Sequence, residues 1–382
     1  MKDLKINYEN YVGDLNDDDL LLLYKKTKEK IEEYDTLNLA LKVGVLNSLY
    51  GALSTPYFRL YNLRIAEAIT ACGRHILKDS ARYINDYLNN KCNTNSDFVL
   101  YQDTDSMFLG LGKYIESNKD LHSKFSTLKS NKEKVDFILK LCKEIEKVVN
   151  DYSLNVIQKQ HFNSQEKDYT INWKQEIVCP SILLVQKKKY GCWVVNEEGK
   201  EVDKIKVTGL DIIRSETSKP IKAMLKSVMT SVLKNEDDNK IRSEIRKHIT
   251  DIRNLPIEDV SANVSVNNIK KYITDDGPIK GTPWHVKGVY THQVLVKKFG
   301  LEDRYQEVVE GDKSKIIYLK PNSYGFETIT YSSKYPKELK CIKPDIEKMI
   351  EKFFVKKIGM LLEPCNKMSL LDLNAETLDF FF

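Results

Sequence analysis

The sequence predicts an α+β protein, in which helices accompany an antiparallel sheet and a short hairpin. Three observations carry this prediction. Apolar residues recur at helical spacing over residues 63–88. Segments that alternate between apolar and polar residues follow within residues 169–207 and are typical of strands. A polar hexapeptide, residues 101–106, separates two apolar runs and predicts a hairpin over about residues 97–111.

The first 54 residues predict helices. Asn16 precedes three aspartates and caps a helix that continues to about residue 33. A second helix covers about residues 36–48 and runs into Tyr50 and Gly51. The helix over residues 63–88 presents one apolar face to a core, formed by Ile65, Ile69, Cys72, Ile76, Ile84 and Leu88.

The rest of the chain predicts a sheet followed by basic helices. A helix over residues 132–152 follows the hairpin, and strands are predicted at residues 169–178, 181–185, 190–195 and 204–207. Two helices rich in lysine and arginine cover residues 219–234 and 240–253. A loop-rich region comes next, and a tail after Lys367 contains no basic residue and ends on three phenylalanines.

Composition bounds the function only loosely. A length of 382 residues predicts two or three domains. No segment approaches the ~18–20 apolar residues of a membrane helix, and the N-terminus lacks the apolar core of a signal peptide, so we expect no membrane partner and a cytoplasmic location. The net charge of +5 leaves the partner undecided. Seven scattered cysteines without zinc-ligand spacing predict reduced, mostly buried thiols.

The hexapeptide Tyr101-Gln102-Asp103-Thr104-Asp105-Ser106 carries the chemistry. Two carboxylates two residues apart can point the same way on an extended chain. Their repulsion is offset if a hard cation such as Mg²⁺ lies between them and a phosphate, which indicates phosphoryl transfer. Taken alone, the pattern is also compatible with a solvated turn, because turns favour aspartate.

Three ordered motifs raise the specificity of this signal. Asn47-Ser48-Leu49-Tyr50-Gly51, the Asp103-Thr104-Asp105 hairpin and Lys187-Lys188-Lys189-Tyr190-Gly191 resemble motif B, motif C and the primer-grip motif of family B DNA polymerases. The resemblance extends from about residue 36 onward and looks closest to the replicative polymerases of T-even-like bacteriophages. It implies partial helical fingers (residues 1–54), a palm (55–209), a mostly helical thumb (210–367) and a C-terminal tail (368–382).

The resemblance also implies roles at the catalytic site. Asp105 is the principal ligand of two Mg²⁺ ions, and Asp103 supports their coordination. Asn47, Tyr50 and Gly51 face the nucleotide. The family lysine that grips the triphosphate lies four residues before the asparagine, where this chain has Val43, so the role passes to Lys42 or to another lysine. The alternative interpretation of this segment is a core helix that ends in a Tyr-Gly cap.

Other residues are implied to bind DNA or a partner protein. Lys187, Lys188, Lys189 and Tyr190 resemble the segment that holds the primer, although lysine runs are commonly solvated strand ends. Thumb candidates for contact with the duplex backbone are Lys270, Lys271, Lys280 and Lys287. The tail residues Leu378, Phe380, Phe381 and Phe382 resemble the element that docks on a sliding clamp; the alternative is a tail folded back on the thumb.

Motif A, which provides the opposing metal-binding aspartate, is absent, and so are the acidic motifs of a proofreading domain. We therefore expect a split polymerase whose N-terminal polymerase and exonuclease polypeptide completes the Mg²⁺ site. Its substrates are primer-template DNA and deoxynucleoside triphosphates. Two alternatives remain: a non-catalytic DNA-binding remnant or decoy, and a fragment of a single-chain enzyme.

Overall fold

The computed structural model describes residues 47–163, 171–210, 212 and 214–372, together with single helical residues between positions 22 and 40. The chain divides into two compact units. The first unit comprises Met1–Phe125 and Lys147–Trp173, and the second comprises Ser126–Glu146 and Lys174–Phe382. The helices and antiparallel sheets of both units confirm the predicted α+β class.

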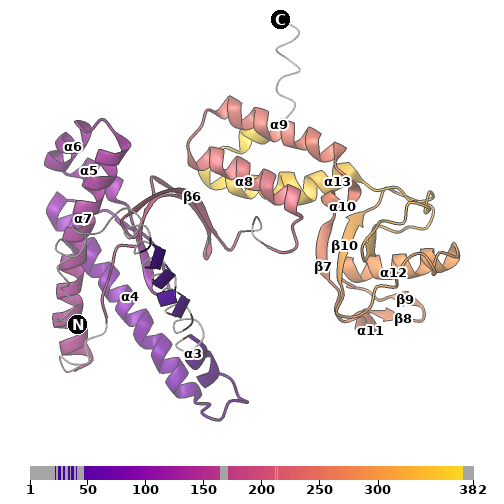
Figure 1. Ribbon diagram of the computed structural model, residues 1–382, viewed down its shortest axis with the longest axis horizontal. Coiled ribbons are helices and arrows are strands. Elements are labelled where there is room, and N and C mark those ends of the chain that lie inside the picture. Colours follow the sequence, from indigo (N-terminus) through magenta and orange to yellow (C-terminus); the bar gives the residue numbers. More distant parts are fainter. Residues whose placement is uncertain are drawn as a thin grey trace, which may run out of the picture. The chain divides into compact units, whose positions relative to one another are not determined.

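A long helix and a hairpin organise the first unit (Figure 1). Asn62 caps the helix by accepting a hydrogen bond from the Ile65 amide, and Asn93 ends it in the left-handed conformation. The helix that follows α6 begins in the second unit and ends in the first. The elements in chain order are α3 (Asn47–Leu53), α4 (Leu63–Cys92), β1 (Val99–Asp103), β2 (Ser106–Leu109), α5 (Leu111–Ser117), α6 (Lys119–Ser126), α7 (Asn131–Tyr152) and the π-helix η2 (Ser153–His161).

Only the second half of α4 has the predicted core face. Ile84 and Leu88 are buried, whereas Ile65 and Ile69 are nearly half exposed. The hairpin packs on the buried half, where Asn85 accepts a hydrogen bond from the amide of the fully buried Phe98. The prediction of a core helix was therefore wrong for residues 63–72, because none of the described elements covers Ile65 and Ile69.

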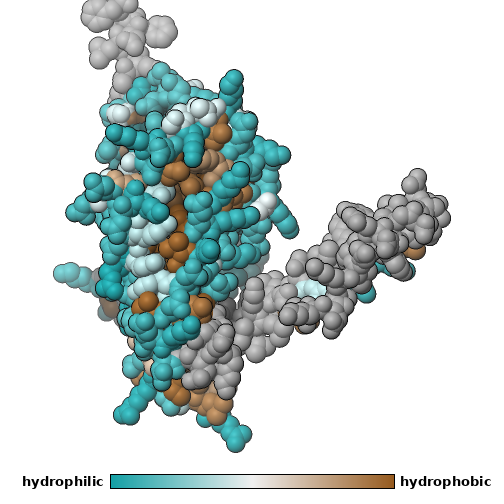
Figure 2. Space-filling view, turned by 90° about the vertical axis from the view of Figure 1, so that its left-hand side faces the viewer, coloured by the Kyte–Doolittle hydropathy of each residue, from teal (hydrophilic) through white to brown (hydrophobic). Residues whose placement is uncertain are grey.

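The face that carries α5, α6 and α7 is largely hydrophilic. Figure 2 shows this side of the chain, where hydrophilic side chains flank a narrow hydrophobic strip. In α7, Leu141, Ile145 and Val149 are buried, while lysines 140, 143 and 147 on the other side of the helix are exposed. This distribution is that of an amphipathic outer helix, as its sequence predicts.

The second unit contains a four-stranded antiparallel sheet with β5 at its centre. β3 and β4 pair with one edge of β5, and β6 pairs with the other. The strand predicted from residue 169 was wrong for residues 171–176, because pairing begins only at Ile177. The strands are β3 (Ile177–Val178), β4 (Ser181–Gln186), β5 (Lys189–Glu197) and β6 (Lys200–Thr208).

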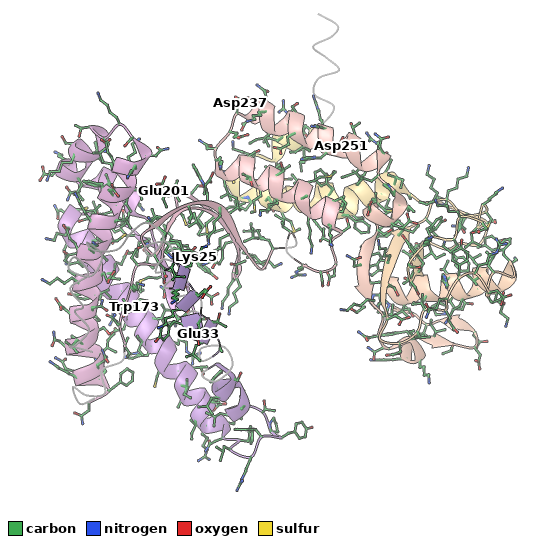
Figure 3. All side chains as sticks on the ribbon, in the orientation of Figure 1. Lys25, Glu33, Trp173, Glu201, Asp237 and Asp251 are labelled. Atoms are coloured by element: carbon green, nitrogen blue, oxygen red, sulfur yellow. The ribbon has the colours of Figure 1, made fainter. Side chains whose placement is uncertain are left out.

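The two predicted basic helices contribute many residues to the core of the second unit. Ile241, Ile245, Ile249 and Ile252 of α9 recur at helical spacing and pack with the buried face of α8. Asp237 caps α9, and Figure 3 labels Asp237 and Asp251 near the two ends of that helix. A C-terminal helical segment completes this layer. The helices are α8 (Lys219–Leu233), α9 (Asp238–Asn254), α10 (Ile257–Val260), α13 (Ile346–Ile350), η4 (Glu351–Val355), α14 (Lys356–Leu362), η5 (Glu363–Cys365) and η6 (Met368–Leu371).

A small sheet lies within the region that the sequence predicted as loop-rich. Its strand order is β11-β10-β7, and α12 packs closely on β11. Gly288 permits this approach, since a Cβ there would lie 2.8 Å from the Thr330 amide nitrogen. The elements are β7 (Ala262–Ser265), α11 (Ile269–Tyr272), β8 (Ile273–Thr274), β9 (Gly277–Pro278), α12 (Trp284–Lys298), β10 (Lys313–Tyr318) and β11 (Thr328–Tyr331).

Two expectations from composition were that the chain lacks membrane helices and that its thiols are mostly buried. Among the described residues, no helix is long and apolar enough to cross a bilayer. All seven cysteines are free thiols, but only Cys192 is fully buried, and Cys72 and Cys341 are exposed. The prediction of mostly buried thiols was therefore wrong.

Candidate functional site

The two aspartates lie at the tip of the β1–β2 hairpin, as the sequence predicts. Asp103 ends β1 and pairs with Ser106, so that Thr104 and Asp105 form a two-residue loop. Asp103 is half-buried and Asp105 is exposed. The two residues therefore do not alternate along one extended strand, because Asp105 belongs to the turn itself.

Thr104 holds this turn in an unusual backbone conformation. Its φ is +55°, and the Asp105 amide donates a hydrogen bond to the Asp103 carbonyl at 2.7 Å across it. A bond between residues two apart defines a γ-turn, and the form with positive φ is strained. Positive φ is costly for a β-branched residue and recurs at functional sites. The Thr104 hydroxyl also donates to the Asp103 carboxylate at 3.0 Å.

The hairpin offers oxygen donors from two residues. Within the described part of the chain, no third histidine, cysteine or acidic side chain joins Asp103 and Asp105 in a metal-binding group. Carboxylate oxygens are the ligands that Mg²⁺ prefers. The donor chemistry therefore fits Mg²⁺, with further oxygen ligands to come from another source.

The segment that resembles motif B forms the short helix α3. Tyr50 is 40% exposed, and a Cβ at Gly51 would meet no atom within 4 Å. The hydroxyls of Ser54 and Thr55, just after the helix, both donate to the Gly51 carbonyl. The helix continues through Gly51 to Leu53, so the alternative interpretation of a core helix with a Tyr-Gly cap was wrong. Lys42 and the side chain of Asn47 lie outside the described residues.

The three lysines that resemble a primer-grip motif surround the β4–β5 turn. Lys187 and Lys188 form a two-residue loop that is closed by the pairing of Gln186 with Lys189. Lys187 and Lys188 are exposed, and Lys189 is half-buried at the start of β5. Tyr190 pairs with Leu184 on one side and Thr208 on the other. This turn and the β1–β2 hairpin belong to different units.

The four lysines that were predicted to contact the duplex backbone lie on neighbouring elements. Lys270 and Lys271 are in α11, Lys280 follows β9, and Lys287 is in the first turn of α12. All four are exposed. Figure 1 shows α11, β8 and β9 together beside α12. The Glu310 carboxylate accepts hydrogen bonds from the Asn268 and Ile269 amides and fixes the start of α11.

The tail residues Leu378, Phe380, Phe381 and Phe382 lie outside the described residues. The chain that leads to them is anchored. Leu370 in η6 is buried, and Arg242 of α9 donates a hydrogen bond to the Ser369 carbonyl.

Sequence reasoning missed a group of three side chains in the first unit. His75, Asp79 and His161 place their nitrogen and oxygen atoms within 4.8 Å of one another. The His75–Asp79 spacing of one helical turn in a predicted helix was an available signal. His161 could not be added to that pair from the sequence, because it lies 86 residues away from His75.

Similarity to known proteins shows the class to which this α+β chain belongs. The model of DNA polymerase family B matches residues 21–159 and 128–364. The chain therefore belongs to DNA polymerase family B.

Two phage proteins are among its relatives. The chain is 31% identical over 298 residues to the DNA-directed DNA polymerase of Escherichia phage RB69, which covers 76% of this chain and 32% of that protein. It is 27% identical over 355 residues to the enzyme of Enterobacteria phage T4, with coverage of 88% and 38%. The DNA polymerase alpha catalytic subunit of Xenopus laevis is 27% identical over 222 residues, 58% of this chain and 12% of that protein. The chain thus spans about a third of the length of the phage relatives.

Proposed function

We propose that this chain is the C-terminal portion of a replicative DNA-directed DNA polymerase. It supplies motif B, motif C, the primer grip and the thumb for template-directed nucleotidyl transfer. The observation that carries the proposal is the Asp103-Thr104-Asp105 γ-turn inside a region matched by the family model. In this proposal residues 1–54 are partial fingers, 55–209 the palm, 210–367 the thumb and 368–382 the tail.

Asp105 is the principal Mg²⁺ ligand in this proposal, and Asp103 supports it. The exposed turn leaves the Asp105 carboxylate accessible, while the Thr104 hydroxyl orients the Asp103 carboxylate. Bound Mg²⁺ would supply activation of the primer 3′-hydroxyl and neutralisation of the triphosphate charge. Tyr50 and Gly51 would form part of the nucleotide surface, with Asn47 and Lys42 nearby in sequence.

A partner polypeptide would provide the motif A aspartate and the proofreading domain. Exposed apolar side chains around α3 and the first half of α4 support a covering partner. They are Leu49, Tyr50, Tyr57, Phe58, Leu60, Tyr61, Leu63, Ile65 and Ile69. Exposed apolar side chains that cluster in this way are typical of interaction sites.

The exposed lysines support contact with duplex DNA. Lysine neutralises phosphate without reading base sequence, which suits an enzyme that copies any template. Lys187, Lys188, Lys189 and Tyr190 would contact the primer strand. The thumb lysines 270, 271, 280 and 287 would contact the duplex backbone.

Primer extension tests the proposal. The purified chain alone should be inactive, and mixing it with the polypeptide that carries motif A should restore extension. Asp105→Ala should abolish extension by the mixture while duplex binding persists. Asp97→Ala, which removes an exposed carboxylate just before β1, should leave extension unchanged.

Different results of the primer-extension assay would support other interpretations of the chain. Extension by the chain alone would refute the need for a partner. An inert mixture that still binds duplex DNA would favour the DNA-binding remnant. Extension that survives Asp105→Ala would refute the metal assignment.

The tail is proposed to dock on the sliding clamp through Leu378, Phe380, Phe381 and Phe382. Deleting residues 378–382 should leave synthesis on short primers intact and remove stimulation by the clamp. Unchanged stimulation would exclude the tail as the docking element.

A further inference from the structure

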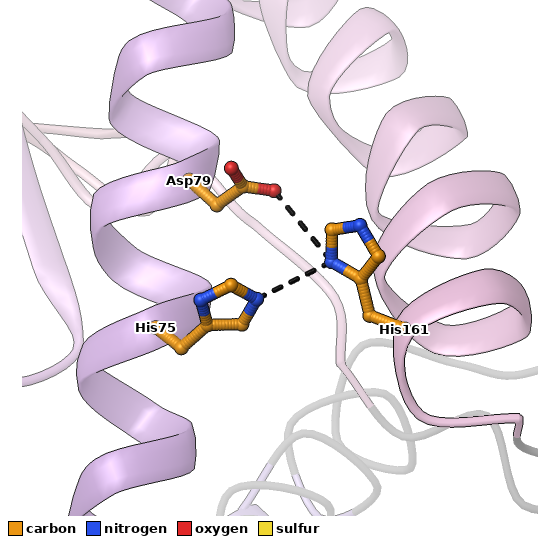
Figure 4. A group of neighbouring side chains, drawn as sticks. All are labelled: His75, Asp79 and His161. Atoms are coloured by element: carbon orange, nitrogen blue, oxygen red, sulfur yellow. Dashed lines mark hydrogen bonds and ion pairs between the residues drawn. The ribbon is translucent and has the colours of Figure 1, made fainter.

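A compact group of metal-type donors joins α4 to η2. His75 and Asp79 lie one turn apart on α4, and His161 ends η2. Figure 4 shows the His161 imidazole facing both other side chains. His161 Nδ1 lies 3.3 Å from His75 Nε2 and 3.9 Å from Asp79 Oδ2. Among the described residues, this is the only group of three such side chains within reach of one ion.

The donor types and spacings match a transition-metal site. Zinc binds imidazole nitrogen and carboxylate oxygen at ~2.0–2.2 Å, so neighbouring donors of a tetrahedral site lie ~3.3 Å apart. The two imidazole nitrogens already have this separation, and Asp79 Oδ2 lies 3.9 Å from His161 Nδ1. Two imidazoles with one carboxylate favour Zn²⁺ or a related ion, whereas Mg²⁺ prefers oxygen donors.

The carboxylate is held in place by its neighbours. Asp79 is 4% exposed. The Tyr152 hydroxyl donates to its Oδ2 at 2.6 Å, and the Arg82 guanidinium pairs with its Oδ1. Tyr152 itself stacks on Tyr83 with ring centroids 3.8 Å apart. Such supporting bonds orient metal ligands and are typical of built metal sites.

The group opens onto a cavity of about 400 Å³. Its charged lining consists of Arg74, Lys78 and Arg82 beside Asp79. Three cations against one carboxylate leave the cavity positive, so a metal ion there needs negative charge in its open coordination position. An anionic oxygen, from hydroxide or from an oxyanion such as phosphate, would suit that position.

We propose that His75, Asp79 and His161 bind one divalent transition-metal ion, with Zn²⁺ as the preferred metal and an anionic oxygen as fourth ligand. The bound ion clamps the end of η2 to the middle of α4. Because it binds the folded chain, it also stabilises the first unit by mass action. The site is independent of the two aspartates of the hairpin and does not require polymerase activity.

Cobalt titration of the purified, metal-free chain tests the proposal. One equivalent of Co²⁺ should give a visible tetrahedral absorption band without the near-ultraviolet band of thiolate ligation, which separates this site from the seven free cysteines. Zn²⁺ should displace it and raise the melting temperature, while Mg²⁺ should do neither.

Matched variants locate the ion. His75→Ala and His161→Gln should each weaken Co²⁺ binding by roughly 10-fold or more. His122→Ala, at an exposed histidine of α6, and Lys78→Ala, in the cavity wall, should leave stoichiometry and ligation unchanged. Circular dichroism of the metal-free variants checks folding, and both ligand variants change exposed side chains.

Two results would overturn the proposal. One is the absence of stoichiometric Co²⁺ and Zn²⁺ binding by the folded chain. The other is undiminished binding in both His75→Ala and His161→Gln, which would leave the cluster as an ordinary hydrogen-bonded contact between α4 and η2. Neither result depends on primer extension. Failure of the metal proposal would therefore leave the proposed polymerase function untouched, and the reverse also holds.

Discussion

A Cβ at Gly209 would lie 2.0 Å from the carbonyl oxygen of Lys188. The end of β6 therefore packs directly against the backbone of the lysine turn, and only glycine fits. Both residues have positive φ, +65° at Gly209 and +62° at Lys188. This contact links the turn proposed to grip the primer to the segment that enters the proposed thumb.

Gly209→Ala should displace the lysine turn and lower the free energy of unfolding. An alanine at positive φ costs ~1–2 kcal/mol by itself, and the backbone clash adds to that cost. Gly199→Ala is the matched control, since Gly199 has φ +84° but a Cβ added there would meet no atom within 4 Å. Denaturant unfolding should show the larger loss at Gly209. Equal losses of unfolding free energy in the two variants would mean that the lysine turn moves away from Gly209→Ala without an energetic penalty.

The lysine turn should contribute to the salt dependence of duplex binding. Replacing Lys187 and Lys188 with alanine removes two exposed charges, and each lost phosphate contact should reduce the slope of log K against log salt by ~0.9. Lys200→Ala removes an exposed charge at the β5–β6 turn of the same sheet and should not change the slope. Fluorescence anisotropy over a salt series measures both. An unchanged slope in the double variant would exclude phosphate contact by this turn.

Thr104→Asn should stabilise the hairpin, because asparagine tolerates positive φ better than a β-branched residue. We expect a gain of ~0.5–1 kcal/mol in the free energy of unfolding. Thr94→Asn is the control: its hydroxyl also donates one 3.0 Å hydrogen bond, but its φ is not positive. Thermal unfolding of both variants distinguishes relief of strain from loss of a hydroxyl. Destabilisation by Thr104→Asn would show that the Thr104–Asp103 bond outweighs the strain.

Acid should destabilise the second unit through His292. Burial lowers the pKa of this α12 side chain from 6.5 to about 4. In the unfolded chain this histidine is protonated below pH 6.5, whereas in the folded chain it is protonated only below about pH 4. The free energy of unfolding therefore falls as the pH falls through that window. Between pH 7 and pH 5 the loss from this group is about 2 kcal/mol.

His292→Gln should remove the acid-dependent loss that comes from His292, although the substitution lowers the free energy of unfolding at pH 7. Urea unfolding of both proteins at pH 7 and pH 5 measures the difference, in which the shared contribution of carboxylates cancels. The same acid-dependent loss in the variant and the parent chain would contradict the assignment to His292.

Local sequence patterns determined much of the fold. The isoleucine spacing of α9 shows which face of that helix is buried, and the β-branched and apolar residues of β4 and β5 favour strands. These elements therefore lie close to their predicted ranges. The β1–β2 turn was predicted because a polar hexapeptide between apolar runs has few other solutions. The three motifs, taken in their order along the chain, were sufficient to identify the family.

The tertiary structure decided what depends on distant contacts. Ile65 and Ile69 have the pattern of core residues and yet are exposed, because burial requires a covering element that periodicity cannot report. In the sheet of β7, β10 and β11, β7 pairs with the remote strand β10, and all three short strands carry weak local signals. The γ-turn at Thr104 and the meeting of His75 with His161 are likewise fixed by packing.

The sequence by itself determined which elements form and to which family the chain belongs, because those properties depend on local residue spacing and on motifs. Only the tertiary structure decided which side chains meet, as Gly209 meets the Lys188 carbonyl. The physical reason is that such contacts depend on how remote segments fill the same space.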